Sequence, residues 1–533
     1  MISRLLLLWI LALSFFVHLW NVSGFPAIHP DEGTYMGRAM HVLNGLGPQD
    51  ELSKFDHTQV SNSSYDHPYL GPVFLAFVFK TIGYPDVLRP VDDIHSIEML
   101  YMVPRILMGL LAVVDTFLVY KICEQRYSRN VAIIASVLFA VMPMSWLLRR
   151  IVLDSILLPF LLSSVLFALY AKHAVIKNQY KKSILLILFS GIFMGLAIFT
   201  KAPAFTMIPL MVFLLYSNSN VNAKSDVNNS SNKKRGWRSI GLWFIPIVLI
   251  PAIWPAYAIY LGQFNEWLDG IYFQGAQRYQ EQGLTIFNMI NIFIRDDPLL
   301  LAIGFAGFGL SVIKRDPFPL LWVIPYLIFV YSVGWGNHFH WIPVLPVICI
   351  ASALFLDGIR KKVITMKTSI SRKLSLIMIS AIIIFGFTST MLVITTNISS
   401  SQYGASAFTA SELQDENQNK DNITVISGPV FSWLFKYVYE KEHILSHVRD
   451  SSTPINTNKI ILIRDSTYRS ILSGENENKT QIALLSALQN SSYTAAKFRD
   501  DTIFYDFKKY PYAIIRDAQA GSRRSGIDIN LNY

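Results

Sequence analysis

Long apolar runs alternate with short polar loops from the start of the chain to about residue 396. Runs of this kind predict membrane-spanning helices, because about 20 apolar residues cross the hydrocarbon core of a bilayer. No small-residue cleavage site follows the first run, so we expect it to stay as a helix. The pattern predicts an all-α polytopic membrane bundle of about eleven transmembrane helices, at residues 4–20, 99–121, 131–148, 151–172, 183–200, 203–216, 238–260, 298–313, 318–335, 341–357 and 374–396.

One apolar segment, residues 70–83, is too short to cross about 30 Å as a helix, and we expect it to lie in the interface or to re-enter. If it does not cross, the loops rich in Lys and Arg all fall on the side of the N-terminus. Such loops stay in the cytoplasm. The predicted topology is therefore an integral, multi-pass protein of the plasma membrane, with a cytoplasmic N-terminus and an extracytoplasmic C-terminus.

The composition changes near residue 397, where Asn, Ser and Asp become frequent. Short β-branched runs at residues 423–426 and 459–463 predict strands, and helical patterns lie between and after them. We therefore expect two domains: a transmembrane domain at residues 1–396, whose external loop 21–98 carries interfacial helices, and a small extracytoplasmic α/β domain at residues 397–533.

Composition and charge narrow the class of function. Hydrophobic residues make up 52% of the 533-residue chain and charged residues only 15%, as in a membrane protein. The net charge of +10 would suit a nucleic-acid partner, but Lys and Arg concentrate in the loops between spans, which indicates membrane orientation instead. Two cysteines, Cys123 and Cys349, define neither a disulfide framework nor a thiolate metal site.

Residues suited to chemistry gather on the predicted external side. Asp31 and Glu32 follow the first span directly. Two adjacent carboxylates near a low-dielectric slab are costly unless a cation, a metal or a proton-transfer role stabilises them. The alternative is that Asp31 caps a surface helix.

The other external candidates are imidazoles and charged groups at the ends of several helices. Each has a plain alternative: a turn with an incidental histidine, snorkelling arginines, a helix cap, or interfacial hydrogen bonding. Taken together they suit an anionic head group, whose phosphate needs Arg or Lys. The candidates are His67, Arg105, Arg149, Arg150, Asp154, Lys201, His338 and His340.

With these residues, the chain resembles the GT-C class of membrane glycosyltransferases, particularly the dolichyl-phosphate-mannose protein mannosyltransferases and the lipid A aminoarabinose transferases. The resemblance covers about residues 1–360. It rests on the ordered set Asp31-Glu32, His67-Pro68-Tyr69-Leu70-Gly71-Pro72, Arg150-Ile151-Val152-Leu153-Asp154, Gly195–Pro203 and His340–Pro346. Tyr69 stands where the family pattern has a second proline.

The resemblance implies an inverting transfer of a hexose, with mannose the first candidate, from a polyprenyl-phosphate donor to a hydroxyl of a protein or glycolipid on the extracytoplasmic face. Asp31 would act as the base or orient the nucleophile, and Glu32 and Asp154 would support the site or bind a divalent cation if one is used. The departing phosphate would be neutralised by cations and bound by imidazoles, at Arg105, Arg149, Arg150, Lys201, His67, His338 and His340. A divalent cation is compatible with these residues but is not required, and no set of metal ligands is predicted.

Two rival classes remain. A transporter or lipid flippase for a phosphorylated lipid also needs charged groups in a bundle, but it places them near the midplane and often has two related halves. A sensor needs only one or two spans as an anchor. The polar residues stand at one set of helix ends and no repeat is found, so the transferase is preferred.

Overall fold

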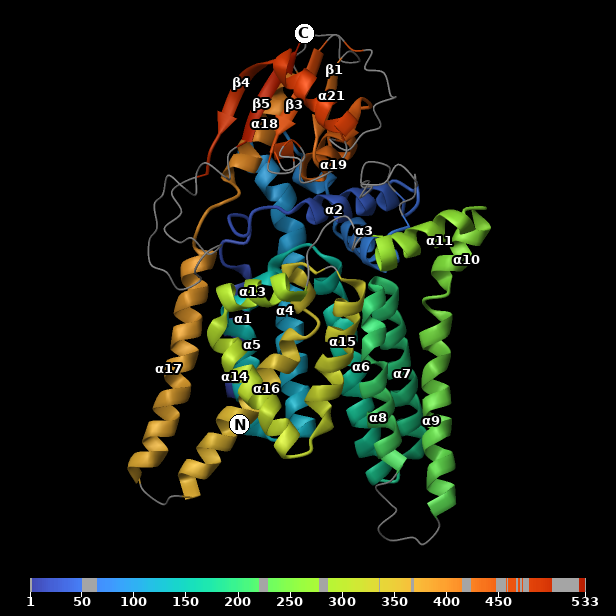
Figure 1. Ribbon diagram of the computed structural model, residues 1–533, viewed down its shortest axis with the longest axis vertical. Coiled ribbons are helices and arrows are strands. Elements are labelled where there is room, and N and C mark those ends of the chain that lie inside the picture. Colours follow the sequence, from blue (N-terminus) through green and yellow to red (C-terminus); the bar gives the residue numbers. More distant parts are fainter. Residues whose placement is uncertain are drawn as a thin grey trace.

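The computed structural model describes residues 2–49, 65–219, 229–277, 286–334, 336–365, 369–414, 423–446, 457, 459–465, 468–469, 472, 479–500 and 527–532. Three levels are visible in these residues (Figure 1): a bundle of long helices, a layer of short helices above it, and a mixed sheet with its helices at the top. The N-terminus lies toward the bundle end and the C-terminus at the top of the sheet.

The bundle holds the helices that the apolar pattern predicts. In chain order these are α1 (Ile2–Leu19), α4 (Ile94–Arg126), α5 (Arg129–Val141), α6 (Leu153–Ile176), α7 (Tyr180–Thr200), α8 (Ile208–Ser219), α9 (Asn229–Leu249), α14 (Pro298–Ile313), α15 (Pro317–Val333), α16 (Leu345–Thr365) and α17 (Ser369–Ile394). Many of their outward residues are large and apolar, such as Trp9, Phe305 and Ile377. That surface is what a helix bundle presents to lipid.

The number of spans differs from the prediction. Among the described residues, five helices are long and apolar enough to cross a membrane, or up to seven if two bent pairs each count as one span. The protein is therefore an integral, multi-pass membrane protein, but the count of eleven is not confirmed. Several predicted spans correspond to helices of fewer than 18 residues, including α8 and α15.

One predicted span is broken by a bend, and a second bend comes directly before another predicted span. The predicted span 131–148 is α5 followed, after a bend of 68°, by the 3-10 helix η3 (Pro143–Arg149). A proline cannot donate its backbone nitrogen and disfavours a helical residue before it, so α5 ends at Val141. A sharper bend of 115° separates α13 (Ile286–Asp296) from α14, where Asp297 caps the second helix. The first bend carries the chain from the bundle into the layer of short helices, and the second carries it from that layer back into the bundle.

The layer above the bundle contains the elements closest to the candidate residues. Its helices are α2 (Pro30–Leu43), α3 (Leu70–Ile82), η2 (Asp86–Leu88), η4 (Ala202–Met207), α10 (Ile253–Tyr260), α11 (Phe264–Tyr272), the π-helix η6 (Phe273–Gln277), α13 and η7 (His338–Trp341). Helix α3 is the segment expected not to cross. Its 13 residues span only about 20 Å, and it lies beside α2 (Figure 1).

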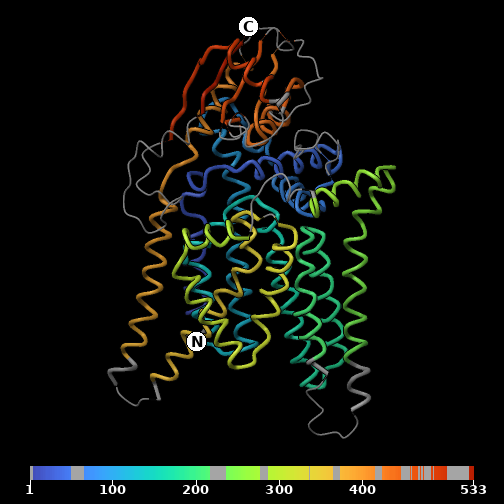
Figure 2. The backbone as a smooth tube through the Cα atoms, in the orientation of Figure 1, coloured from blue at the N-terminus to red at the C-terminus, as the bar shows by residue number. Residues whose placement is uncertain are grey.

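The C-terminal part is a five-stranded mixed sheet. Its strand order is β2-β1-β3-β5-β4, with β1 parallel to β2 and β3, and β5 antiparallel to β3 and β4. The predicted strands correspond to β1 (Ile423–Ser427) and β3 (Lys459–Arg464), which are almost fully buried. The remaining elements are α18 (Ser400–Gln414), α19 (Pro429–Tyr437), α21 (Lys479–Asn490), β2 (Ile444–Ser446), β4 (Tyr493–Phe498) and β5 (Ile527–Asn532). Figure 2 traces the path from α17 into this part.

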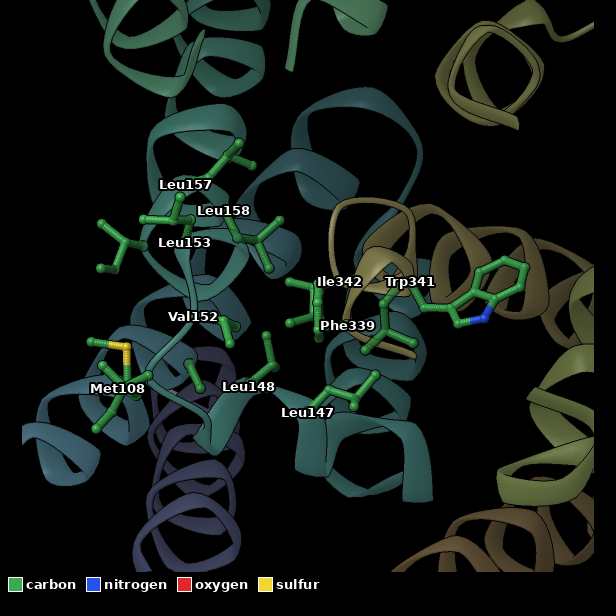
Figure 3. Packing of buried hydrophobic residues seen from close by; sticks show 14 of the residues in the cluster. Met108, Leu147, Leu148, Val152, Leu153, Leu157, Leu158, Phe339, Trp341 and Ile342 are labelled. Carbon is green, nitrogen blue, oxygen red and sulfur yellow. The ribbon is translucent and has the colours of Figure 1, made fainter. Parts of the chain in front are cut away.

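An apolar core joins the short elements η3 and η7 (Figure 3). Leu147 and Leu148 of η3 and Val152 before α6 lie opposite Phe339 of η7 and Ile342, and all five are buried. Packing of this density leaves little freedom to the short elements. The core therefore holds two segments that carry polar candidates, η3 and η7, in one arrangement.

Candidate active site

Helix α2 carries both acids of the adjacent pair in its first turn. His29 is its N-cap: the backbone N–H of Asp31 donates to His29 Nδ1 at 3.2 Å, and the backbone N–H of His29 donates to Glu32 Oε1 at 3.0 Å. Pro30 occupies the first helical position, where its missing N–H costs nothing. The alternative that Asp31 itself caps the helix is therefore wrong, because His29 has that position.

Glu32 is the centre of a buried ion network. Its side chain has no exposed surface, and Arg105 donates to both of its oxygens at 3.1 Å. Arg150 donates to Oε1 at 2.8 Å, and the backbone N–H of Ile151 donates to Oε2 at 3.3 Å. Burial by itself would raise the pKa of Glu32, but the two guanidinium groups outweigh burial and lower it. Glu32 is thus a fixed carboxylate that ties α2 to α4 and η3.

Asp31 has a different environment from its neighbour. Its side chain is 12% exposed, and its nearest charged or titratable partner among the described residues is His29, with 3.6 Å between Oδ1 and Nδ1. That nitrogen already accepts the N–H of Asp31, and burial lowers the pKa of His29, so the ring is neutral and offers no proton there. Among the described residues, no Lys or Arg forms an ion pair with this carboxylate, although its charge reaches Arg150 over a longer distance.

A second ion pair lies close to Asp31. Lys201, directly after α7, donates to Asp154 Oδ2 in the first turn of α6 at 2.6 Å, and both side chains are buried. The Lys201 ammonium also lies 5.2 Å from the centre of the Phe339 ring. Asp31 lies close enough to Asp154 for the two charges to interact. The Lys201–Asp154 pair is therefore a neighbour of Asp31.

Tyr35 and Arg38 extend the site along α2. They stand four and seven residues after Asp31 and so share one face of the helix. Arg38 forms a buried ion pair with Asp66, with 2.7 Å between Nη2 and Oδ1. Burial raises the pKa of Tyr35, and the charges of Asp31 and Asp66 raise it further, so its hydroxyl stays protonated. His67 follows Asp66 and is half-buried.

Arg149 and Arg150, at the end of η3, lie in different environments. Arg150 contacts the site: it binds Glu32 and the Ala27 carbonyl, lies 5.1 Å from the Trp146 ring, and keeps a buried Nε without a hydrogen-bond partner among the described residues. Arg149 points to the end of α1, where it donates to the Trp20 carbonyl. Its Nε and Nη1 are buried and likewise have no partner in the described part of the chain.

The two histidines of η7, His338 and His340, make different contacts. The His338 ring stacks on Trp146 with 5.7 Å between ring centres and meets the His29 ring edge-on at the same separation. Burial and the nearby Arg150 hold the pKa of His338 well below its usual range. The Nδ1 atom of His340 accepts the backbone N–H of Asn337 at 2.7 Å, so this ring closes the η7 turn.

The structure brings most of the predicted residues together around the first turn of α2. Arg105 is fully buried, and its N–H groups donate to Glu32 and to the carbonyls of Val22 and Ser23. Within the described residues, no three His, Cys, Asp or Glu side chains form a group that could hold a metal ion.

Sequence reasoning missed three residues at this site: His29, Tyr35 and Arg38. The spacing of Asp31, Tyr35 and Arg38 at i, i+4 and i+7 was a usable signal, because it places polar groups on one face of an otherwise buried helix. The cap role of His29 had no such signal, since Ser, Thr, Asp and Asn are the residues expected there.

Residues 51–264 match the family model of dolichyl-phosphate-mannose-protein mannosyltransferases. The match includes His67, Asp154 and Lys201, whereas Asp31 and Glu32 precede it. No curated protein matches the chain in sequence.

Solved structures give the fold. ArnT from Cupriavidus metallidurans, bound to undecaprenyl phosphate, is similar with a TM-score of 0.60 and 13% identity, over 99% of this chain and 98% of that chain. The oligosaccharyltransferase of Archaeoglobus fulgidus tethered to an acceptor peptide is similar with a TM-score of 0.59 and 12% identity, over 93% of this chain and 72% of that chain. AglB from that organism, with an inhibitory peptide and dolichol phosphate, has the same TM-score and identity over 91% of this chain and 72% of its own. The predicted resemblance is confirmed: the chain is an integral membrane protein with the GT-C glycosyltransferase fold, similar to the dolichyl-phosphate-mannose protein mannosyltransferases over residues 51–264.

Proposed function

We propose that this protein transfers a sugar from a polyprenyl-phosphate donor to an acceptor hydroxyl on the extracytoplasmic face, with Asp31 as the general base. One observation carries the proposal. Of the four carboxylates around α2, Glu32, Asp66 and Asp154 are each paired with a buried cation, whereas Asp31 has no cationic partner among the described residues and keeps some exposure. A carboxylate that is held but not neutralised is suited to accept a proton.

The chemistry is a single displacement. As the acceptor oxygen attacks the sugar carbon, its proton passes to Asp31, a new carbon–oxygen bond forms, and the bond between the sugar and the phosphate breaks. The polyprenyl phosphate leaves with the electron pair, and the configuration at the sugar carbon inverts. An alcohol is almost fully protonated at neutral pH, so the base lowers the barrier.

The leaving phosphate needs positive charge and hydrogen-bond donors. Lys201 uses one donor on Asp154 and has two others, and Arg149 and Arg150 keep buried N–H groups without partners among the described residues. We assign these three cations to the phosphate. His67, His338 and His340 are proposed to contact the phosphate or the sugar, and Arg105 to act on the substrate indirectly, through Glu32.

The donor and acceptor classes follow from similarity. The matched family is described by its mannose donor, and the similar structures hold undecaprenyl phosphate, dolichol phosphate or an acceptor peptide. We propose a hexose, with mannose the first to test, and a protein or glycolipid acceptor. The topology proposed is a cytoplasmic N-terminus, a transmembrane domain at 1–396 and an extracytoplasmic domain at 397–533.

The test is transfer of radiolabelled sugar from a panel of polyprenyl-phosphate sugars by the purified protein and by Asp31→Asn, with peptide, glycolipid and water as acceptors. Asp86→Asn is the matched control, because it removes an exposed acid from η2. We expect one donor to react with the wild type and the control but not with Asp31→Asn. Near-normal turnover in Asp31→Asn would remove the base. Movement of intact lipid donor across vesicles, without transfer, would favour a flippase.

A further inference from the structure

The C-terminal part of the chain rests directly on the helix that carries the proposed base. Helix α19 packs against α2 so closely that a Cβ atom on Gly33 would overlap the backbone of Pro429. Tyr101 of α4 donates to the Val430 carbonyl, and its ring meets the Trp433 ring edge-on at 5.3 Å between centres. Helix α2 is therefore enclosed between the bundle and the sheet domain (Figure 1).

The segment that leads into α2 is held by α18 and the residues before it. Ser399 Oγ donates to the carbonyls of Gly24 and Pro26, both at 3.1 Å, and the backbone N–H of Ile398 donates to the Gly24 carbonyl at 2.9 Å. The Tyr403 hydroxyl donates to the Ser23 carbonyl at 2.8 Å. Residues about 375 positions apart in sequence thus form one continuous contact.

Gln402 makes the contact nearest to the proposed base. Its Oε1 accepts the backbone N–H of Ile28 at 2.7 Å, and its Nε2 donates to the carbonyl of the same residue at 2.9 Å. One carboxamide thereby satisfies both backbone polar groups of Ile28, as a neighbouring strand would. A two-point contact fixes the rotation of the peptide as well as its position.

We propose that Gln402 is a positioning residue for the transfer reaction: through its two hydrogen bonds to Ile28 it sets the placement of the Asp31 carboxylate. Only His29 and Pro30 separate Ile28 from Asp31, and both have restricted backbones, as the N-cap and the first residue of α2. A shift of the Ile28 peptide is therefore transmitted to Asp31. Glu32 and Arg150 also hold this segment, but each through a single bond, to the N–H of His29 and to the carbonyl of Ala27. Gln402 binds both backbone polar groups of Ile28, and so adds the contact that fixes the rotation of this residue.

This inference rests on the proposed function, since it requires Asp31 to be the base. Its test uses two variants of the full-length protein in detergent. Gln402→Leu keeps the approximate shape and removes both hydrogen bonds, and Gln402→Glu keeps the acceptor for the Ile28 N–H while removing the donor. Gln414→Leu is the matched control, because Gln414 is exposed at the end of the same helix.

We expect Gln402→Leu to lower kcat by about 10- to 100-fold, the effect of a small misplacement of a catalytic group. The donor KM and the unfolding midpoint should stay within twofold and within about 2 °C of the wild type, respectively. Gln402→Glu should keep part of the turnover, and Gln414→Leu should match the wild type. A loss confined to the donor KM, or equal turnover in all variants, overturns the proposal.

Hydrogen–deuterium exchange of the peptide that contains residues 24–34 provides a readout that needs no turnover. We expect faster exchange of this peptide in Gln402→Leu, intermediate exchange in Gln402→Glu and unchanged exchange in the control. Unchanged exchange in Gln402→Leu would show that Gln402 does not hold the segment. Faster exchange in a protein whose wild type transfers no sugar would leave the contact standing and refute the proposed function instead. If Gln402→Leu does not fold, Gln402→Glu decides alone: full turnover with faster exchange overturns the proposal.

Discussion

Replacing the two adjacent carboxylates of α2 one at a time should give opposite results. Glu32→Gln removes a negative charge that has no exposed surface and leaves Arg105 and Arg150 facing the amide group that replaces it. One of the two acceptor oxygens becomes an N–H donor that opposes a guanidinium. Breaking a buried ion pair by removing one partner costs about 3–5 kcal/mol, because the other charge remains buried and unpaired.

Asp31→Asn removes a carboxylate that forms no ion pair with a Lys or Arg among the described residues, and whose contact at 3.6 Å is to the neutral ring of His29. Its effect on the free energy of unfolding should stay within about 1 kcal/mol. Its effect on turnover should be large, about 10²- to 10⁴-fold, because it removes the proposed general base. Stability and activity should therefore be affected by different members of the pair.

Unfolding can be followed with a thiol-reactive dye, because the only two cysteines, Cys123 and Cys349, are both buried. The midpoint of denaturant unfolding in detergent is compared for the wild type, Glu32→Gln, Asp31→Asn and the exposed control Asp86→Asn. We expect a large loss of stability only in Glu32→Gln. Equal midpoints for the two α2 variants, or a larger loss in Asp31→Asn, would refute the division of roles.

Three further measurements test other parts of the site. Lys201→Gln should raise the donor KM about tenfold or more, because a charged hydrogen-bond donor to phosphate is lost; an unchanged KM would exclude a phosphate contact. At a pH below its ordinary pKa of 6.5, His338 gains a proton in the unfolded chain but stays neutral in the fold, so stability should fall as the pH drops below about 6.5. In unfolding midpoints measured from pH 5 to 8, His338→Gln should reduce this dependence of stability on pH. Cysteines placed at the exposed positions 181 and 86 should react with an impermeant reagent from opposite sides of the membrane, and labelling from one side would contradict the proposed topology.

Much of the bundle could be predicted from local pattern. The runs at residues 183–200 and 298–313 correspond closely to α7 and α14, because an apolar helix is specified by consecutive residues. The end of α5 and the short strands were harder to predict. Pro143 ended α5 earlier than the apolar run suggested. The three residues of β2 are too few to show alternation, whereas β5 alternates apolar and polar residues throughout and was a usable signal that was missed.

The order of charged and polar residues along the sequence determined which groups the site contains, since Asp31, Glu32, Arg150, Asp154 and Lys201 were all recognised at helix ends. Only the tertiary structure decided what each group does. The pattern of the sequence does not distinguish the surroundings of Asp31 from those of Glu32, but in the fold Glu32 binds two arginines, from α4 and from the end of η3, whereas the ion-pair contact of Asp31 is to His29. The contact between Gln402 and Ile28 spans 374 positions and has no local signal at all. Ionisation and positioning depend on distances between side chains, and distances between residues so far apart in the chain exist only once the bundle and the sheet have packed together.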